Sequence, residues 1–441
     1  MSDILAILGV LFILALITVI TKLFFKHKKN AELSRKTVHI TMGLTALSFP
    51  FIFDRVLSVV ILGILAFGAM LLLRFIPMLR NSIGTTILGI KRESYGELYF
   101  VFSIAVIFAL HKSTFEYIIP ILVLTFADSV AALIGSSYGR YNMAYSEEDV
   151  KSSEGSVLFF IVAFMCALVP LQLMTEIGRA EVLLISFLIG LLGAMIEAIS
   201  SNGNDNLLLP LLTYSFLRYN IQVPIETLFL NFGVMLFFLI IIMIVYSRGN
   251  ISKLSIFYAL LVAYASMVLG GTKWVLLPAI LLVAYGNLPK MGHEEKQMVL
   301  SYKIIASNAI VGMICLWASV FFPEHVNILY LAFSFSFACF LAINTYSRII
   351  NFEKTTQTTA ALAGFVKGAI LIALPTFLFI QVGWVIIVAY LTFLTFAIPP
   401  SIILNKKLDY KNVNSVTANA NTVLVGTLTA IFAGGLFLWF I

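Results

Sequence analysis

Apolar runs of about 20 residues, the length that crosses the hydrocarbon core of a bilayer, recur along almost the whole chain. Hydrophobic residues make up 61% of the 441 positions and charged residues only 11%, which excludes an ordinary soluble domain. No small-residue cleavage site follows the first run, so we expect this run to be retained as a helix. We therefore predict an all-α fold, a polytopic membrane helical bundle of about 14 to 16 transmembrane helices in two related units.

The basic residues indicate how the chain is oriented. They gather after the first, third and fifth apolar runs, whereas the alternate loops hold only Arg55, Lys112 and Arg179. Because loops rich in Lys and Arg stay in the cytoplasm, we expect the N-terminus to face outward and the basic loops inward. The net charge of +7 is thus a topology signal in a lipid bilayer, and we expect no nucleic acid as partner. The short inward loops and the lack of a targeting segment predict an integral protein of the bacterial inner (cytoplasmic) membrane.

The polar segments of the first half fall on one predicted side of the membrane. The inward loops contain "ELSRKTVHITMG", "KRESYGELYF", "GRYNMAYSEEDVKSSEGS" and "IEAISSNGNDNLLLP". An arbitrary scatter would have put some of these segments in outward loops. The distribution therefore predicts a single polar site that faces the cytoplasm.

Asp128 follows the apolar run "YIIPILVLTF" without a break, which puts a carboxylate inside a membrane helix. At helical spacing it shares one face with four small residues: Ala131, Ala132, Gly135 and Gly139. Small faces are where membrane helices approach closely, so we expect Asp128 to lie in a helix interface. An ionisable side chain at this depth is a functional-site hypothesis, and the alternative is a structural, hydrogen-bonded acid.

Glu197 repeats this design in the seventh apolar run. It shares a stripe with the small residues Gly190, Gly193, Ala194 and Ser201. Both acids lie near the inward ends of their runs, so we expect them to be able to approach each other.

The neighbouring loops supply cations and glycines. The cations are Arg35, Lys36 and Lys151, and the glycines that can offer backbone donors are Gly135, Gly139 and Gly155. Carboxylates that bind Mg²⁺, next to Lys or Arg and glycine-rich turns, are typical of nucleotide-phosphate chemistry. The chain has no Walker loop and no protein-kinase signature, so a phosphate site here would be of another kind.

Each of these segments also has an ordinary interpretation. "KHKKNAELSRK" is typical of a positive-inside anchor, and His39 of a histidine at a helix end. "SSNGNDN" has the composition of a turn, and "SSEGS" fits a serine cap with Glu154 in the first turn of a helix. These interpretations do not explain why all of the segments share one predicted face.

Five segments of the first half resemble, in order, the motifs of the membrane-bound phytol and dolichol kinases. The related CTP-dependent diacylglycerol kinases and phosphatidate cytidylyltransferases belong to the same group. The segments are "RKTVHITMG", "SYGE", "ADSVAALIGSSYGR", "KSSEGS" and "IEAISSNGNDNLLLP". One departure is Ser129, where the family commonly has threonine, and this keeps the hydroxyl.

The resemblance implies an enzyme, a CTP-dependent lipid-alcohol kinase with Mg²⁺ as cofactor. Its substrate would be a membrane isoprenoid alcohol of the phytol, geranylgeraniol or polyprenol type. The acids that would hold Mg²⁺ or activate the alcohol are Asp128, Glu197 and Asp205. The residues that would surround the nucleotide are Arg35, Lys36, His39, Gly135, Gly139, Lys151, Glu154, Gly155, Ser156 and Asn206.

The second half contains four polar segments, "SYKIIASNAIVG", "INTYSRI", "TTQTTAALAGFVKG" and "NVNSVTANANTVLVG". They resemble motifs of the phytyl-phosphate kinases, which add a second phosphate, but the glutamate of one motif and the glycines of another are missing. Asn344 stands where that family has its catalytic aspartate, and a neutral amide cannot replace a carboxylate as a charge partner of Mg²⁺. We therefore predict three parts: 1–224 as a phytol/dolichol kinase-like membrane domain, 225–253 as a connecting helix, and 254–441 as a degenerate phytyl-phosphate kinase-like domain.

Two other functions are weighed against the kinase. A cytidylyltransferase acting on a lipid phosphate would use similar acids and cations but would release pyrophosphate and form a CDP-lipid. A secondary transporter would place its acids near the midplane, with access from both sides. The gathering of polar segments toward one predicted face favours an enzyme.

Overall fold

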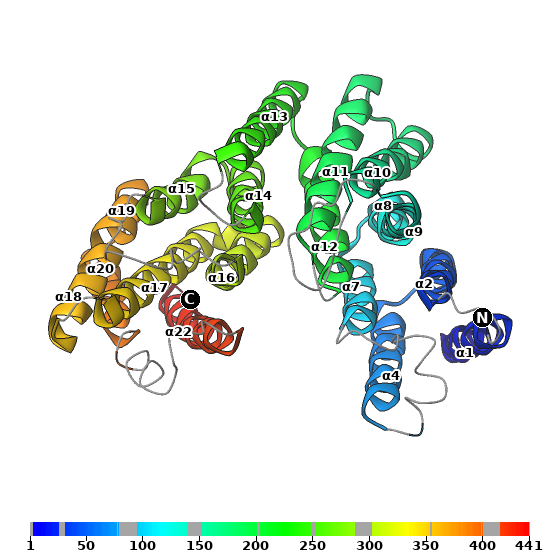
Figure 1. Ribbon diagram of the computed structural model, residues 1–441, viewed down its shortest axis with the longest axis horizontal. Coiled ribbons are helices and arrows are strands. Elements are labelled where there is room, and N and C mark those ends of the chain that lie inside the picture. The colour runs from blue at the N-terminus through cyan, green and yellow to red at the C-terminus, as the bar shows by residue number, and fades with distance from the viewer. Residues whose placement is uncertain are drawn as a thin grey trace. The chain divides into compact units, whose positions relative to one another are not determined.

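The computed structural model describes residues 3–25, 31–76, 78, 95–139, 152–200, 203–248, 253–286, 302–352, 355–380, 382–397, 399 and 415–440. Within these ranges the regular secondary structure is helical throughout, and none of it is a β-strand (Figure 1). The predicted all-α fold is confirmed.

The chain divides into two compact units, Met1–Gly233 and Val234–Ile441. The first unit contains α1 (Asp3–Phe25), α2 (Ala31–Leu47), α3 (Phe49–Ile52), α4 (Val56–Phe75), α7 (Gly96–Leu110), α8 (Thr114–Leu122), η2 (Val123–Ala127), α9 (Asp128–Tyr138), α10 (Ser153–Met174), α11 (Arg179–Ile199), α12 (Asp205–Asn220) and the start of α13 (Ile225–Arg248). The division falls within α13. The family assignments of residues 1–224, 225–253 and 254–441, and the relatedness of the two units, stay predictions.

The second unit contains the rest of α13 and the helices that follow it. These are α14 (Lys253–Gly270), α15 (Thr272–Gly286), α16 (Tyr302–Phe321), η3 (Pro323–His325), α17 (Val326–Phe352), α18 (Gln357–Gly368), η4 (Ala369–Ala373), α19 (Leu374–Phe379), α20 (Trp384–Phe396) and α22 (Ser415–Phe440).

Many of the helices have the length and composition of membrane spans. Seven in the described part of the chain are long and apolar enough to cross a bilayer: Asp3–Phe24, Val56–Phe75, Thr114–Tyr138, Ser153–Met174, Arg179–Ile199, Pro323–Tyr346 and Gln357–Phe379. Further apolar helical segments of 10–17 residues, several of them parts of longer helices, accompany them. The protein is therefore a polytopic membrane helical protein, as its apolar runs predict.

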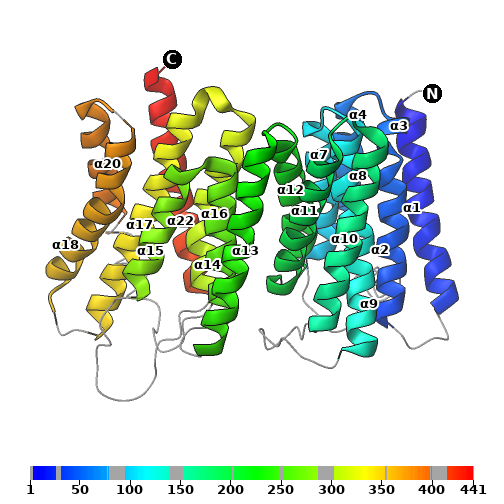
Figure 2. The same ribbon diagram turned by 90° about the horizontal axis from the view of Figure 1, so that it is seen from above.

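The helices of the first unit run roughly along one direction, and the span α8–η2–α9 lies in the middle of this unit (Figure 2). Of its most apolar window 56% is buried, compared with 17% for α4. It is one long helix with two irregularities, Pro120 within α8 and the π-helical turn η2 directly before Asp128. Proline removes a backbone N–H donor, and a π-turn holds one residue more than an α-helical turn, so both are typical places for a helix to kink. The turn η2 packs against α2, α10 and α12.

Hydrogen bonds near both ends join α7 to α12. At their beginnings the Asn206 side chain reaches the Gly96 carbonyl, at 2.9 Å. At the other end the Leu110 carbonyl, which has no helical donor of its own, accepts from the Tyr214 hydroxyl and from Arg218 Nη1. These bonds fix the position of α12, which carries two of the predicted site residues at its beginning.

In the second unit α17 is the most buried span, with 78% of its apolar window inside. Its Ser334 hydroxyl lies 2.8 Å from the Tyr390 hydroxyl and also bonds Thr376, all three being buried. Gly368 allows α18 to approach the backbone of α17, because a Cβ there would stand 2.9 Å from the Ala338 carbonyl oxygen. The second unit is thus tied together by small-residue contacts and a buried hydroxyl cluster.

Candidate functional site

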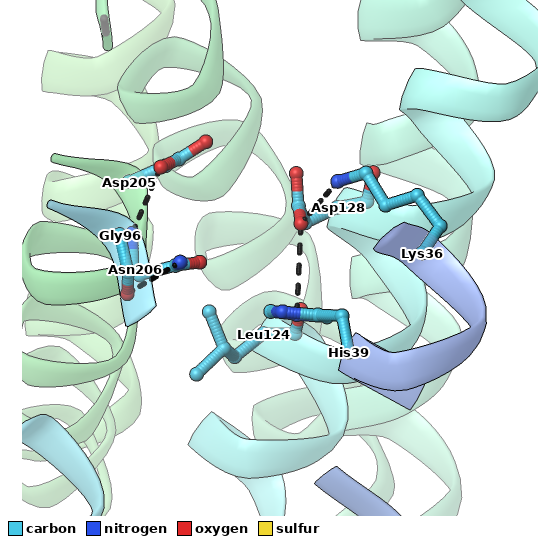
Figure 3. A network of polar contacts seen from close by, with 7 residues as sticks. All are labelled: Lys36, His39, Gly96, Leu124, Asp128, Asp205 and Asn206. Atoms are coloured by element: carbon cyan, nitrogen blue, oxygen red, sulfur yellow. Dashed lines mark hydrogen bonds and ion pairs between the residues drawn. The ribbon is translucent and has the colours of Figure 1, made fainter. Parts of the chain in front are cut away.

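The carboxylate of Asp128 is bound by Lys36 of α2. Lys36 Nζ donates to Oδ2 at 2.6 Å and lies 3.4 Å from the Asp128 carbonyl oxygen (Figure 3). The two side chains are only 3% and 7% exposed. Because an unpaired charge at such a position is costly, each group depends on the other. The predicted place of Asp128 in a helix interface is confirmed.

His39 lies on the same face of α2, less than one turn after Lys36. Its Nε2 is 3.0 Å from the carbonyl oxygen of Leu124 and 3.6 Å from Asp128 Oδ2 (Figure 3). Leu124 is part of η2, the π-turn that ends directly before Asp128. Such turns are rare in proteins overall, but many of those that occur lie at functional sites. One face of α2 therefore contacts both the carboxylate and the turn that sets its direction.

The contact between α2 and the π-turn continues beyond the polar residues. Gly43, one turn after His39, lies so close to Thr125 that a Cβ at position 43 would overlap the threonine side chain. The His39 ring also packs against Phe100 of α7, with ring centroids 5.0 Å apart. These contacts hold α2 firmly against η2.

α12 contributes the second group of polar side chains. The Asn206 Nδ2 donates to the Gly96 carbonyl oxygen, and the Asn206 N–H lies 3.0 Å from Asp205 Oδ1. Asn206 is buried and Asp205 is half-buried at the start of the helix. Figure 3 shows both side chains across from the Lys36–Asp128 pair, and α12 packs directly against η2. Two carboxylates, an amide and an ammonium group thus belong to one neighbourhood of the first unit.

Glycines bring α9 and α10 together. A Cβ at Gly135 would stand 3.0 Å from Ser152 Oγ, and one at Gly155 would stand 3.1 Å from the Ala131 carbonyl oxygen. A Cβ at Gly139 would stand 2.6 Å from Ser152 Cβ. The Ser152 hydroxyl also caps α10 by accepting from the Gly155 N–H at 3.2 Å. The small-residue face that follows Asp128 is therefore a helix interface, as predicted.

Four further predicted nucleotide residues lie around this interface or outside the described chain. Glu154 and Ser156 are half-buried in the first turn of α10, and Ser153 Oγ donates to Glu154 Oε2 at 3.2 Å. Arg35 is half-buried on α2, directly before Lys36. Lys151 lies outside the described residues. The assignment of these residues to a nucleotide stays a prediction.

Glu197 is buried near the end of α11, 5% exposed. The glycines of its stripe pack on aromatic rings of α10, Gly190 on Phe160 and Gly193 on Phe159. The stripe therefore forms a helix interface, as its small residues predict.

The three predicted acids do not form a compact metal cage. Among the described residues, no three His, Cys, Asp or Glu side chains gather closely enough to hold a metal ion. The assignment of Asp128, Glu197 and Asp205 to Mg²⁺ and catalysis stays a prediction. The oxygen donors of Asp128 and Asp205 nevertheless fit this ion, because Mg²⁺ in phosphate sites is commonly held by one or two carboxylates with water and substrate oxygens.

Sequence reasoning missed several groups of the site. The carbonyl groups of Leu124 and Gly96 carry no side-chain signal, although Gly96 belongs to the noted segment "SYGE". The glutamate of that segment, Glu97, is bound by Arg74 at 2.9 Å, and the Arg74 guanidinium lies over the Tyr95 ring at 3.9 Å. The segment itself was the available signal, but its residue types alone do not identify their partners.

Comparison with known proteins gives one curated relative. The chain is 30% identical over 185 residues to a phytol kinase of Synechocystis sp., and the match covers 41% of this chain and 76% of that protein. No protein-family model matches the chain, and no solved structure matches it. A relative at this identity, matched over three quarters of its own length, indicates common descent of the matched part. The chain therefore belongs to the phytol kinase-like family.

Proposed function

We propose that this protein is a membrane kinase that transfers the terminal phosphoryl group of a nucleoside triphosphate to the hydroxyl group of a lipid alcohol. The relationship to a phytol kinase supports the class of reaction. The observation that carries the proposal is the buried Lys36–Asp128 pair, which faces Asp205 and Asn206 inside a bundle of membrane helices. Carboxylates and an ammonium group within one small region are what a phosphoryl-transfer site requires.

The transfer makes one bond and breaks another. The alcohol oxygen bonds to the γ-phosphorus, the bond to the bridging oxygen breaks, and the nucleoside diphosphate leaves with that oxygen. The hydroxyl proton goes to a carboxylate. Asp128 already accepts a short hydrogen bond from Lys36, so we assign the role of proton acceptor to Asp205. The role of Asp128 would be to orient Lys36.

CTP is the donor in this proposal, and Mg²⁺, held by carboxylates among Asp128, Glu197 and Asp205, would neutralise charge on its β- and γ-phosphates. The cations Arg35, Lys36 and Lys151 would bind phosphate oxygens. The first turn of α10, which contains Glu154, Gly155 and Ser156, would lie beside the phosphates, where the partial positive charge of a helix beginning favours an anion. The Gly155 and Ser156 N–H groups themselves already donate to Ser152. Gly135 and Gly139 permit the close approach of α9 to this turn.

The depth of the site supports a lipid as acceptor. Asp128 is the first residue of the 11-residue helix α9 and thus lies about 15 Å from its last residue, Tyr138, at the rise of an α-helix. At this level the acceptor hydroxyl can belong to a molecule dissolved in the bilayer, while the nucleotide would enter from the aqueous side. We propose an isoprenoid alcohol of the phytol, geranylgeraniol or polyprenol type, with the site open to the cytoplasm of a bacterial inner membrane.

The test is transfer of γ-labelled phosphate from CTP to phytol, geranylgeraniol and a polyprenol by the purified full chain in lipid nanodiscs with Mg²⁺. We expect a labelled phospholipid product from the wild type, and a rate at least about 100-fold lower for Asp128→Asn. The matched control is Asp54→Asn, an exposed aspartate in the turn before α4, which is expected to keep the wild-type rate. ATP in place of CTP tests the donor.

Two outcomes would overturn the proposal. Release of pyrophosphate with formation of a CDP-lipid from a lipid phosphate would replace the kinase by a cytidylyltransferase. Absence of any product from folded protein, with all three alcohols and both nucleotides, would contradict an enzymatic function of the site.

A further inference from the structure

We propose that His39 is a positioning residue, which holds the π-turn η2 in shape and so fixes the direction of Asp128, and that it is neither a proton acceptor nor a nucleotide contact. The inference deepens the proposed kinase function and rests on it. It revises the role that the family resemblance implies for this histidine.

The contact with Leu124 determines where the ring proton is. A carbonyl oxygen can only accept a hydrogen bond, so His39 Nε2 must carry a hydrogen and donate it to Leu124 at 3.0 Å. The distance from the same nitrogen to Asp128 Oδ2 is 3.6 Å, which is longer than a hydrogen bond. The Nε2 proton is therefore committed to the backbone of the turn.

The π-turn needs such a donor. It fits one extra residue into the helix for the same number of backbone hydrogen bonds, which leaves a carbonyl group without its usual amide partner. A buried carbonyl group needs a hydrogen bond from another source, and Leu124 is fully buried. The Leu124 carbonyl, which lies within η2, receives such a bond from a different helix, from a His39 side chain that is itself 13% exposed.

The shape of the turn decides where Asp128 points. If η2 relaxed to a regular α-helical ladder, the residues after it would rotate by about 100° and shift by about 1.5 Å relative to α8. Asp128 is the first residue after the turn, so its carboxylate would leave Lys36 and turn away from α12. A donor that keeps the turn open therefore acts directly on the geometry of the site.

Two neighbours on the same face of α2 support this role. Lys36 holds the residue after the turn, and Gly43 packs on Thr125 within it. His39 lies between these two contacts and is the polar one that reaches the turn itself. The His39 ring also packs against the Phe100 ring of α7, with centroids 5.0 Å apart.

The experiment uses three substitutions that separate positioning from proton transfer and from charge. In His39→Gln the amide nitrogen lies the same number of bonds from Cα as Nε2 and can still donate to Leu124. In His39→Asn the amide nitrogen corresponds to the other ring nitrogen and falls short. His39→Leu keeps an apolar side chain of similar size with no donor, and none of the three can accept a proton as imidazole does.

We expect His39→Gln to keep kcat within about 3-fold of the wild type. The Asn and Leu variants should lose about 10- to 100-fold in kcat, with KM for CTP changed by less than about 3-fold. Equal loss in all three variants would indicate a base or a cation at this position and would overturn the inference. A rise in KM for CTP at unchanged kcat would also overturn it, because it would indicate a nucleotide contact.

A second measurement does not depend on activity. Solid-state nitrogen NMR of the full chain in lipid, labelled at histidine, reports which ring nitrogen carries the hydrogen. The signals of His39 are assigned as those that disappear in His39→Gln. The inference requires hydrogen on Nε2 of His39, and hydrogen on Nδ1 alone would contradict it. If the wild type shows this tautomer but transfers no phosphate, the kinase proposal fails and the contact with the π-turn stands.

Discussion

Removing either partner of the buried Lys36–Asp128 pair is expected to destabilise the first unit strongly. The two side chains are 3% and 7% exposed and 2.6 Å apart, so a single substitution leaves the other charge buried without its ion-pair partner at 2.6 Å. Losses of about 3–5 kcal/mol are typical for breaking a buried pair in this way. We expect Lys36→Met and Asp128→Asn each to lower the free energy of unfolding by about this amount.

The double variant Lys36→Met/Asp128→Asn isolates the interaction. Because it leaves no unpaired charge, we expect it to be less destabilised than the two single losses added together, with a coupling energy of at least about 2 kcal/mol. The exposed control is Glu324→Gln, whose His325 contact is 3.8 Å long with side chains 39% and 60% exposed. We expect its effect to stay below about 1 kcal/mol.

The assay is unfolding of the full chain by SDS in mixed micelles, followed by circular dichroism. Hydrogen exchange of peptides from α2 and α9 then shows whether the loss lies at the pair. Tryptophan fluorescence does not serve here, because all four tryptophans follow residue 273. Single losses below about 1 kcal/mol that add within about 0.5 kcal/mol in the double variant would refute the reasoning.

Three further predictions test the packing. Gly155→Ala is expected to lower the free energy of unfolding by about 1–3 kcal/mol in the SDS titration, because its Cβ would stand 3.1 Å from a backbone oxygen. The control Gly68→Ala, whose Cβ would have nothing within 4 Å, should not destabilise the protein. Asn206→Asp should reduce kinase activity more than Asn206→Ala, because it turns a carboxylate toward the Gly96 carbonyl; equal rates of phosphate transfer would contradict this. Tyr390→Phe should cost about 1 kcal/mol, measured by tryptophan fluorescence, and leave the rate of phosphate transfer unchanged.

The helix interfaces could be predicted from the sequence because helical periodicity converts spacing into a face. Asp128 with Gly135 defined such a face, and small faces pack in membranes, so its burial against α10 followed. The same argument held for Glu197 and Gly193. Helical periodicity does not say which neighbouring helix a face meets, so the sequence could not decide whether the acids approach one another.

The polar partners could not be predicted, for two physical reasons. Lys36 and Asp128 are 92 positions apart, and periodicity identifies the face that packs without identifying the helix that it meets. The acceptors at Leu124 and Gly96 are backbone carbonyl groups, which every residue type provides. The π-turn is likewise a change in the backbone ladder, and Pro120 one turn before it was the nearest visible mark.

The pairing also explains how a site of this kind can exist in a membrane. A lone carboxylate in α9 and a lone ammonium in α2 would each be costly to insert, by about 3 kcal/mol on translocation scales. Joined at 2.6 Å they neutralise each other, so most of that cost is removed once α2 has docked on α8–η2–α9. His39 and Gly43 make the same docking depend on the π-turn. The contacts that allow the charges to be buried are therefore the ones that set the direction of Asp128, and a substitution that loosens α2 should impair stability and phosphate transfer together.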